Sequence, residues 1–207
     1  MNRNVRAAAA LGLALFVAAC AGKSELLAPA QSAKPAIVFV RPFAIETSVV
    51  TLDPGFGFTL AHGFLPRTTR ARALGRAVQF ILADALEEHL QTAGLAATRG
   101  RAMPRGATTA LVIGGQFRAL DQGAKRLGDR ARPGHGGSRV AVDAWVAYLA
   151  PGKPAQRLLD LHEDSDLDRR RAERPADANA DAALVGRRIA DAILALARTR
   201  GWLASGR

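Results

Sequence analysis

The sequence predicts an α+β fold, a two-layer sandwich in which two helices lie on one face of a mixed, mostly antiparallel sheet. Two segments carry apolar residues at helical spacing, and the residues between them alternate between apolar and polar as strands do. The expected order is strand, helix, four strands and a final helix. An aliphatic rather than aromatic core follows from the composition, because only 5% of the residues are aromatic.

The first half of the chain supplies one strand and the longer helix. Ile37–Val40 is a β-branched run typical of a strand. Thr47–Leu52 is expected to form a short strand, and residues 55–70 a loop. A helix is predicted over residues 71–93, with Gly94 as its C-terminal stop. Its inward face would consist of Leu74, Val78, Ile81, Leu82, Ala85, Leu86 and Leu90.

Four strands are predicted to follow, over Leu95–Arg99, Thr109–Leu120, residues 139–149 and Arg157–His162. The third is the clearest, because apolar residues alternate along it without interruption. Within the second strand, Gly114-Gly115 indicates a bulge or the close approach of another backbone.

The C-terminal part is expected to be a charged loop followed by the second helix. Residues 163–179 carry many charges and a proline, which favours a loop. Asp181–Thr199 is predicted to be an amphipathic helix, with Trp202 packed behind it. The residues expected on its inward face are Leu184, Val185, Ile189, Ile193 and Leu196.

The first 20 residues have the pattern of an export signal. Arg3 and Arg6 precede about ten apolar residues, too few to span a bilayer, and Cys20 follows as the single cysteine of the chain. This pattern resembles the lipobox of bacterial lipoproteins, in which the cysteine is acylated and becomes the new N-terminus. We therefore expect a signal peptide over residues 1–19, an acylated (palmitate-carrying) Cys20 with a tether over 20–35, and one periplasmic domain over 36–204.

The resemblance to lipoproteins also implies a location. Their sorting depends on the residues after the cysteine, where aspartate usually means retention in the inner membrane. Ala21 and Gly22 stand there in this chain. We therefore expect lipid anchoring in the cell outer membrane, on its periplasmic face.

The charge favours an acidic partner or an anionic surface. Removal of Arg3 and Arg6 with the signal lowers the 29 Lys and Arg to 27, against 18 Asp and Glu, which gives a net charge of +9. At a periplasmic membrane the expected counterions are phospholipid headgroups, lipid A phosphates or an acidic envelope protein rather than nucleic acid. The alternative is a solvated basic surface without a partner.

The sequence gives no candidate for catalysis, a metal or a cofactor. Its four histidines lack metal-ligand spacing, and the acidic residues at 160–168 lack the Gly and Glu of a calcium loop. Neither a G-x-S-x-G elbow nor a phosphate-binding glycine motif occurs. The expected protein is therefore not an enzyme, and no cofactor is expected.

One stretch is a candidate binding site, the glycine-rich and basic residues 119–138 between two predicted strands. Its cations Lys125, Arg126, Arg130 and Arg132 could surround an anion held by backbone amides of the glycines, or bind an acidic partner. The alternative is a long flexible connection whose glycines serve turn geometry.

The same stretch resembles the bacterial lipoproteins of domain-of-unknown-function family 4410. The resemblance is carried by Gly114–Asp121, by Gly123–Arg126 with a spaced Arg130, and by Gly134–Ser138 before a Val-alternating strand. Ala124 and His135 depart from the family's pattern. The resemblance extends over about residues 35–200 and implies a membrane-anchored periplasmic domain, but it supplies no activity.

These observations lead to two hypotheses of function. The first is a non-enzymatic accessory or binding domain on an outer-membrane lipoprotein. The alternative is a lipid- or anion-binding auxiliary subunit of an envelope ABC-type transport system. A deep apolar pocket between the inward faces of 74–90 and 185–196 would favour the alternative.

Overall fold

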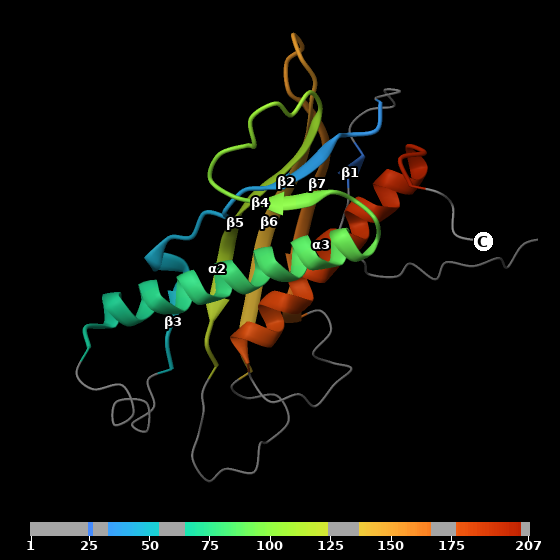
Figure 1. The fold of residues 1–207 in the computed structure, drawn as a ribbon. Helices are drawn as coiled ribbons and strands as arrows, with labels where there is room; N and C mark the ends of the chain where they lie inside the picture. The colour runs from blue at the N-terminus through green and yellow to red at the C-terminus, as the bar shows by residue number, and fades with distance from the viewer. Residues whose placement is uncertain (1–24, 27–32, 54–64, 124–136, 167–176, 204–207) are drawn as a thin grey trace, which may run out of the picture.

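The computed structural model describes residues 25–26, 33–53, 65–123, 137–166 and 177–203. Its seven strands form one mixed sheet, and two helices pack on one face of that sheet (Figure 1). The predicted α+β two-layer arrangement is confirmed. Within the described residues, no helix is both long enough and apolar enough to cross a membrane.

The strands lie in the order β1, β7, β6, β5, β2, β4, and β3 pairs with the C-terminal end of β5. The longest pairings, β5 with β6 and β6 with β7, are antiparallel, whereas β2 pairs in parallel with both β4 and β5. The bounds are β1 Glu25–Leu26, β2 Ile37–Val40, β3 Val50–Thr51, β4 Ala97–Arg99, β5 Ala110–Asp121, β6 Arg139–Leu149 and β7 Gln156–Asp164.

Five of the predicted strands recur as β2, β4, β5, β6 and β7 with small changes at their ends. The predicted strand over Thr47–Leu52 is wrong in its first part. Residues Thr47–Val49 form a 3-10 turn, η1, and only Val50–Thr51 pair with the end of β5. Only Leu120 and Asp121 of β5 pair with this segment, so the ladder is two residues long.

The two glycines of β5 permit the predicted close approach, but they do not form the bulge. A Cβ at Gly115 would lie 2.3 Å from the carbonyl oxygen of Asp143, and one at Gly114 would lie 2.5 Å from the Trp145 ring. The bulge occurs between Phe117 and Ala119 instead. Glycine is therefore required here by space rather than by backbone conformation.

Helix α2 spans Arg67–Thr92 and begins four residues before the predicted start. Val78, Leu82, Leu86 and Leu90 are fully buried, which confirms the predicted phase of the helix. Leu74 and Ile81 lie at the border of the buried face and are only partly buried. The residues that the sequence pattern missed on this face are Ala71, Gly75 and Ala83.

Helix α3 spans Ala178–Thr199 and also begins before its predicted start. The side chain of Asp177 accepts a hydrogen bond from the backbone N–H of Asn179, which caps the helix. Val185, Ile189, Ile193 and Leu196 are buried as predicted, while Leu184 is only partly buried. Beyond the helix, Trp202 is buried as predicted, and its ring stacks on Tyr148 with ring centroids 6.0 Å apart.

The main core lies between the helices and the sheet, and the inward residues of all the long strands contribute to it. A smaller cluster lies on the other face of the sheet, where Phe39, Ala110 and Val112 are buried. Trp145 packs against this cluster. The rest of this outer face carries charged residues, which pair across the strands as described below.

Candidate functional site

The residues that the sequence identified as candidates lie outside the described part of the chain. They are Cys20, Lys125, Arg126, Arg130 and Arg132. The structure does define where their segments attach to the fold. Residues 124–136 leave the sheet after Gly123 and return to it at Gly137.

Three internal segments attach at the same end of the sheet (Figure 1). Thr51 lies opposite Asp121, Asp121 opposite Arg139, and Ala141 opposite Asp164, so β3, β5, β6 and β7 meet there. Segments 54–64, 124–136 and 167–176 continue from these strand ends. We call this the loop end of the sheet, formed by Asp53, Gly123, Gly137, Asp166 and Asp177.

Two cationic segments of the sequence attach at the loop end. Segments 124–136 and 167–176 together hold eight Lys or Arg and three Asp or Glu. The second segment contributes Arg169, Arg170, Arg171 and Arg174. The sequence pattern predicts only a charged loop there, with no relation to the first segment. The hairpin order of β5, β6 and β7 was the available signal, because it places both segments at one end of the sheet.

Buried polar side chains also cluster at the loop end. The buried polar or charged residues of the described chain are Asp53, Ser138, Glu163 and Ser165, and all four belong to this end. Because a buried polar group is costly without a partner, such a cluster must be satisfied internally. Sequence analysis did not identify any of them as a candidate.

The two serines tie β6 to its neighbours. The Ser138 hydroxyl donates to a carboxylate oxygen of Asp181 in α3, at 2.6 Å. The Ser165 hydroxyl oxygen accepts a hydrogen bond from the backbone N–H of Val140, at 3.0 Å. The start of β6 is thereby bound both to the first turn of α3 and to the residue that follows β7.

Arg139 and Asp164 form a bidentate pair across β6 and β7. The Arg139 Nη2 lies 2.6 Å from Asp164 Oδ2, and its Nε lies 3.1 Å from the same oxygen. Partial burial alone would raise the pKa of Asp164. Hydrogen bonds from Arg139 and from the backbone N–H of Asp166, together with the charge of Arg139, outweigh the effect of burial and lower the pKa of Asp164. The hydrogen bond and charge of Asp164 raise the pKa of Arg139 in turn.

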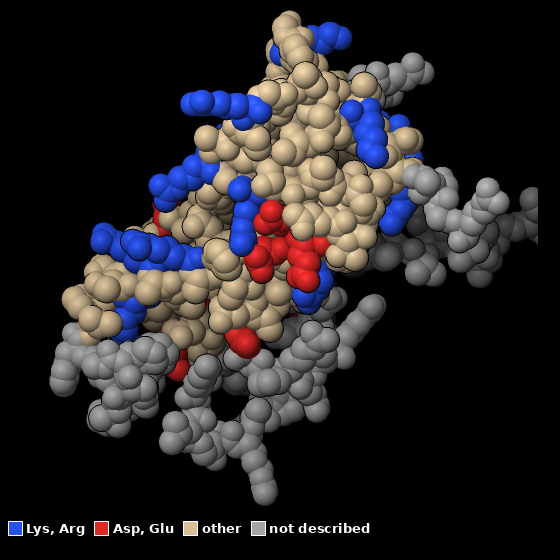
Figure 2. Space-filling view, in the orientation of Figure 1, with Lys and Arg blue, Asp and Glu red and all other residues tan. Residues whose placement is uncertain are grey.

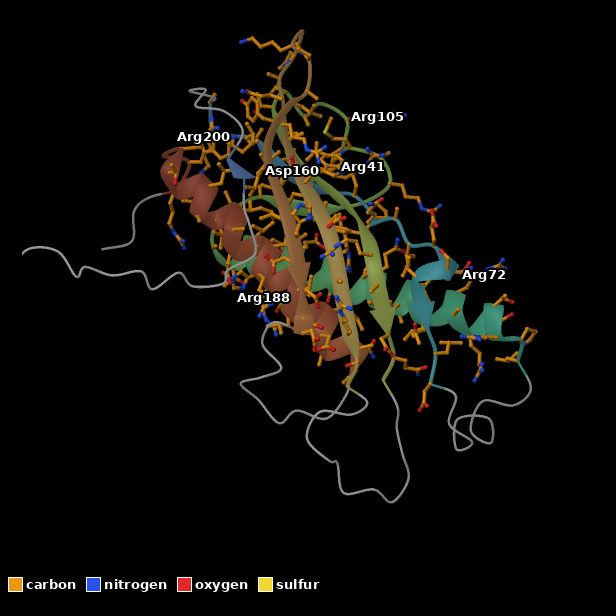
Figure 3. The ribbon with its side chains drawn as sticks, turned by 180° about the vertical axis from the view of Figure 1, so that it is seen from behind. Arg41, Arg72, Arg105, Asp160, Arg188 and Arg200 are labelled. Carbon is orange, nitrogen blue, oxygen red and sulfur yellow. The ribbon has the colours of Figure 1, made fainter. Side chains whose placement is uncertain are left out.

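Arg188 of α3 binds the end of β7 from the helical side (Figure 3). Its Nη1 donates to the backbone carbonyl of Asp164 at 3.1 Å, and the same atom lies 3.9 Å from Glu163 Oε2. Glu163 lies opposite Val142 and so faces the helices, where its carboxylate is almost fully buried. A buried carboxylate at this position requires a cation such as Arg188 nearby.

The described residues at this end are suited to holding segments in place rather than to bond chemistry. Within the described chain, no group of three His, Cys, Asp or Glu side chains could hold a metal ion. The two described histidines are elsewhere: His89 pairs with Asp191 at 2.8 Å, and His162 pairs with Asp143 at 2.7 Å. The loop end is therefore a rigid polar base from which cationic segments leave the sheet.

Comparison with known proteins identifies no relative by sequence. No family model and no curated protein matches the chain. Among solved structures, a PelC dodecamer from Paraburkholderia phytofirmans is 12% identical, with a TM-score of 0.40, over 81% of this chain and 96% of the other. An uncharacterised protein is 8% identical, with a TM-score of 0.34, over 79% of this chain and 90% of the other. Likenesses this weak carry no conclusion about function, and the resemblance to family 4410 stays a prediction.

Proposed function

We propose that this chain is a lipoprotein anchored through Cys20 in the outer membrane, and that its periplasmic domain is a non-enzymatic binding domain. The binding site is the loop end, and its ligand is an anionic envelope component or an acidic protein. The observation that supports this most is the attachment of segments 124–136 and 167–176, with eight Lys or Arg, at one end of the sheet.

The sequence pattern around Cys20 supports the anchor. Lasting attachment to a membrane takes more than one acyl chain, and a triacylated N-terminal cysteine meets that condition. Glu25 and Leu26 pair with Asp160 and Leu159 at the edge of the sheet. Five residues can span at most about 18 Å, so an acylated Cys20 would keep the domain close to the membrane surface.

The construction of the loop end supports the binding role. Binding residues are often carried by loops that a rigid scaffold positions. The described carboxylates there are already bound: Asp164 by Arg139, Asp181 by Ser138, and Asp121 by the backbone N–H of Gly123 at 2.9 Å. The two segments hold eight cations against three acidic residues of their own, and this excess of positive charge is suited to an external anion.

Packing between the helices bears on the transport-subunit alternative. An apolar pocket between the inward faces of α2 and α3 would favour that alternative. A Cβ at Gly186 would lie 2.5 Å from the backbone oxygen of Leu82, so the two helices are in direct contact at this point. Leu82 and Ile189 are fully buried. The contact favours binding at the loop end over binding between the helices.

Acylation is tested by changing Cys20→Ala and labelling cells with palmitate. We expect label in the unchanged chain and none in the variant, because the sequence has no other thiol. The unchanged chain should fractionate with the outer membrane. Label in the variant, or an unchanged chain released with soluble periplasmic contents, would contradict the anchor.

Binding at the loop end is tested with a photo-crosslinker in intact envelopes. Thr51 is an exposed position at the loop end, and Ala155 is an exposed position before β7, at the opposite end of the sheet. We expect a defined crosslinked product from position 51 and none from position 155. Equal products from both positions, or products from position 155 only, would exclude the loop end as the binding site.

A further inference from the structure

We propose that a second surface, along the β4 edge of the sheet, binds the surface of an anionic lipid bilayer. We call it the basic edge, and it consists of Arg72, Arg76, Phe80, Arg101, Met103 and Arg105. The first three residues belong to α2 and the last three to the connection between β4 and β5. The inference rests on the envelope location proposed above, but it concerns a different part of the molecule from the loop end.

The arginines of the basic edge differ from those on the outer face of the sheet. On that face Arg118 pairs with Asp143, Arg139 with Asp164 and Arg157 with Asp160. The arginines of the basic edge are Arg72, Arg76, Arg101 and Arg105. Within the described part of the chain, none of these four side chains has an ion-pair or hydrogen-bond partner. Their charge is therefore available to an anion outside the protein.

The charge of α2 opposes the stability of its own N-terminal half. Its first ten residues include four arginines, and its first turn has no acidic residue. The sequence has no Asp or Glu from residue 54 to residue 83. Positive charge near a helix N-terminus is unfavourable because the helix dipole is positive there. A local rule broken in this way is typical of a functional surface.

Exposed apolar side chains accompany these arginines. The exposed large hydrophobic residues of the described chain are Leu65, Phe80 and Met103, with exposed fractions of 53%, 58% and 38%. Phe80 follows Arg76 by one helical turn, and its ring lies 4.2 Å from the guanidinium of Arg99. Met103 stands between Arg101 and Arg105 in the sequence. All three apolar side chains thus lie in α2, directly before it, or in the connection that follows β4.

The combination of free arginines and exposed apolar side chains fits a bilayer better than an acidic protein. At a membrane surface the arginines meet headgroup phosphates, while Phe80 and Met103 enter the boundary with the acyl chains. An acidic peptide would satisfy the arginines but would leave the apolar side chains in water. Arg72 and Arg105 lie on one side of the molecule and Arg188 and Arg200 on the other (Figure 3).

No carboxylate in the described part of the chain pairs with an arginine of the basic edge. Figure 2 shows the Asp and Glu of the helical face gathered in a patch near its centre, with Lys and Arg along the border. Asp84 and Glu87 of α2 bind Arg99, and Asp191 of α3 binds His89. These carboxylates pair with Arg99 of β4 and with His89 of α2 rather than with Arg72 or Arg76.

The test is co-sedimentation of the chain without its signal peptide, residues 20–207, with vesicles of phosphatidylglycerol or phosphatidylcholine at physiological salt. Cys20→Ser removes the thiol, so that acylation contributes nothing to binding. The edge variant changes Arg72, Arg76, Arg101 and Arg105 to Gln. The control variant removes the same charge elsewhere, at four exposed cations with no ion pair within the described chain: Lys34, Lys153, Arg187 and Arg198.

We expect binding to phosphatidylglycerol and not to phosphatidylcholine, with the edge variant weakened at least 100-fold. Each basic residue near an anionic membrane contributes about five-fold to the partition constant. The control variant should lose far less, because its charges belong to segments outside the basic edge. A Phe80→Ser, Met103→Ser double variant should weaken binding about ten-fold while it retains all the arginines.

Three results would overturn the proposal. They are no binding to phosphatidylglycerol, equal losses in the edge and control variants, and binding to polyglutamate that matches vesicle binding and ignores Phe80 and Met103. The third would identify an acidic protein as the ligand instead. Palmitate labelling of Cys20 is a separate readout, so failure here is distinguishable from failure of the anchor.

Discussion

Single residues at the loop end show how charge is used inside the fold. Arg139 donates two hydrogen bonds to the Asp164 carboxylate, and Arg188 of α3 donates one to the backbone carbonyl of Asp164. The hydroxyls of Ser138 and Ser165 add hydrogen bonds at the same place. Each of these contacts joins two different elements, so the loop end is fixed by side chains as well as by the ladder.

The lowered pKa of Asp164 predicts a dependence of stability on pH. An unfolded aspartate titrates at about 3.9 and the folded group lower, so the Arg139 pair stabilises the protein above about pH 4. This contribution is lost as the pH falls through the lowered pKa. Asp164→Asn should cost about 1 kcal/mol at pH 7, and the cost should vanish in strong acid.

Urea unfolding of the unchanged chain and of Asp164→Asn from pH 7 to pH 2 would measure this difference. Asp160→Asn, which breaks the exposed pair with Arg157, is the control and should cost less at pH 7. A cost of Asp164→Asn that does not change with pH would show that the side chain acts by shape rather than by charge.

Individual core residues could be predicted where a period identifies them, and not elsewhere. Val140, Val142 and Val146 alternate with outward residues and are fully buried. The pairing of β6 with β7 shifts between Val146 and Ala147, and Leu158 is the extra residue in β7. Leu158 and Leu159 are therefore both buried although they are adjacent. Nothing in the alternation of the sequence indicates such an insertion. The same holds for Glu163, whose burial depends on Arg188, a residue distant in the sequence.

At the scale of elements, the helices were predictable in phase but less so at their ends. The apolar period predicts which face is buried, whereas a helix begins where a cap is available. Asp177 caps α3 before the apolar period starts, so the prediction from Asp181 is late. The 3-10 turn η1 replaces half of a predicted strand, because a β-branched run is only a strand when a partner lies beside it.

The contact between the two helices depends on a glycine in α3. Gly to Ala within a helix normally stabilises by about 1 kcal/mol. At Gly186 the new Cβ would lie 2.5 Å from the backbone oxygen of Leu82, which cannot move without the helix. Gly186→Ala should therefore destabilise the protein by about 1–3 kcal/mol.

Gly75 of α2 is the matched control for this prediction. A Cβ there would lie 3.2 Å from Cδ1 of Ile45, the far end of a flexible side chain. Gly75→Ala should therefore be neutral or stabilising in thermal unfolding. If both variants changed the melting temperature alike, the helices would not approach at Gly186 as closely as the structure indicates.

At the scale of the whole molecule, the layers could be predicted but the meeting of distant segments could not. Helical and strand periods suffice to predict two helices on one sheet. The strand order places β2 between β5 and β4, and no local pattern contains that information. The attachment of segments 124–136 and 167–176 at one end follows instead from the hairpin order of β5, β6 and β7. The charge pattern by itself indicated only the first of these two basic segments as a candidate site.

The four cations Lys125, Arg126, Arg130 and Arg132 provide the test of binding at this scale. Their change to Gln should reduce crosslinking from Thr51, because the positive charge that attracts the ligand is lost. The melting temperature should change by less than about 2 °C, because the described carboxylates nearby have partners of their own. Crosslinking and thermal unfolding are measured on the same preparations.

Removal of equal charge at Lys34, Lys153, Arg187 and Arg198 is again the control, and it should leave crosslinking from Thr51 nearly unchanged. The opposite result, a lower melting temperature with unchanged crosslinking, would show that the loop cations pair with carboxylates of the domain, Asp121 or Asp129 among them. Asp164 is already held by Arg139, so a loop cation that paired with it would have to displace that arginine. We therefore expect the four cations to act on a ligand rather than on the fold.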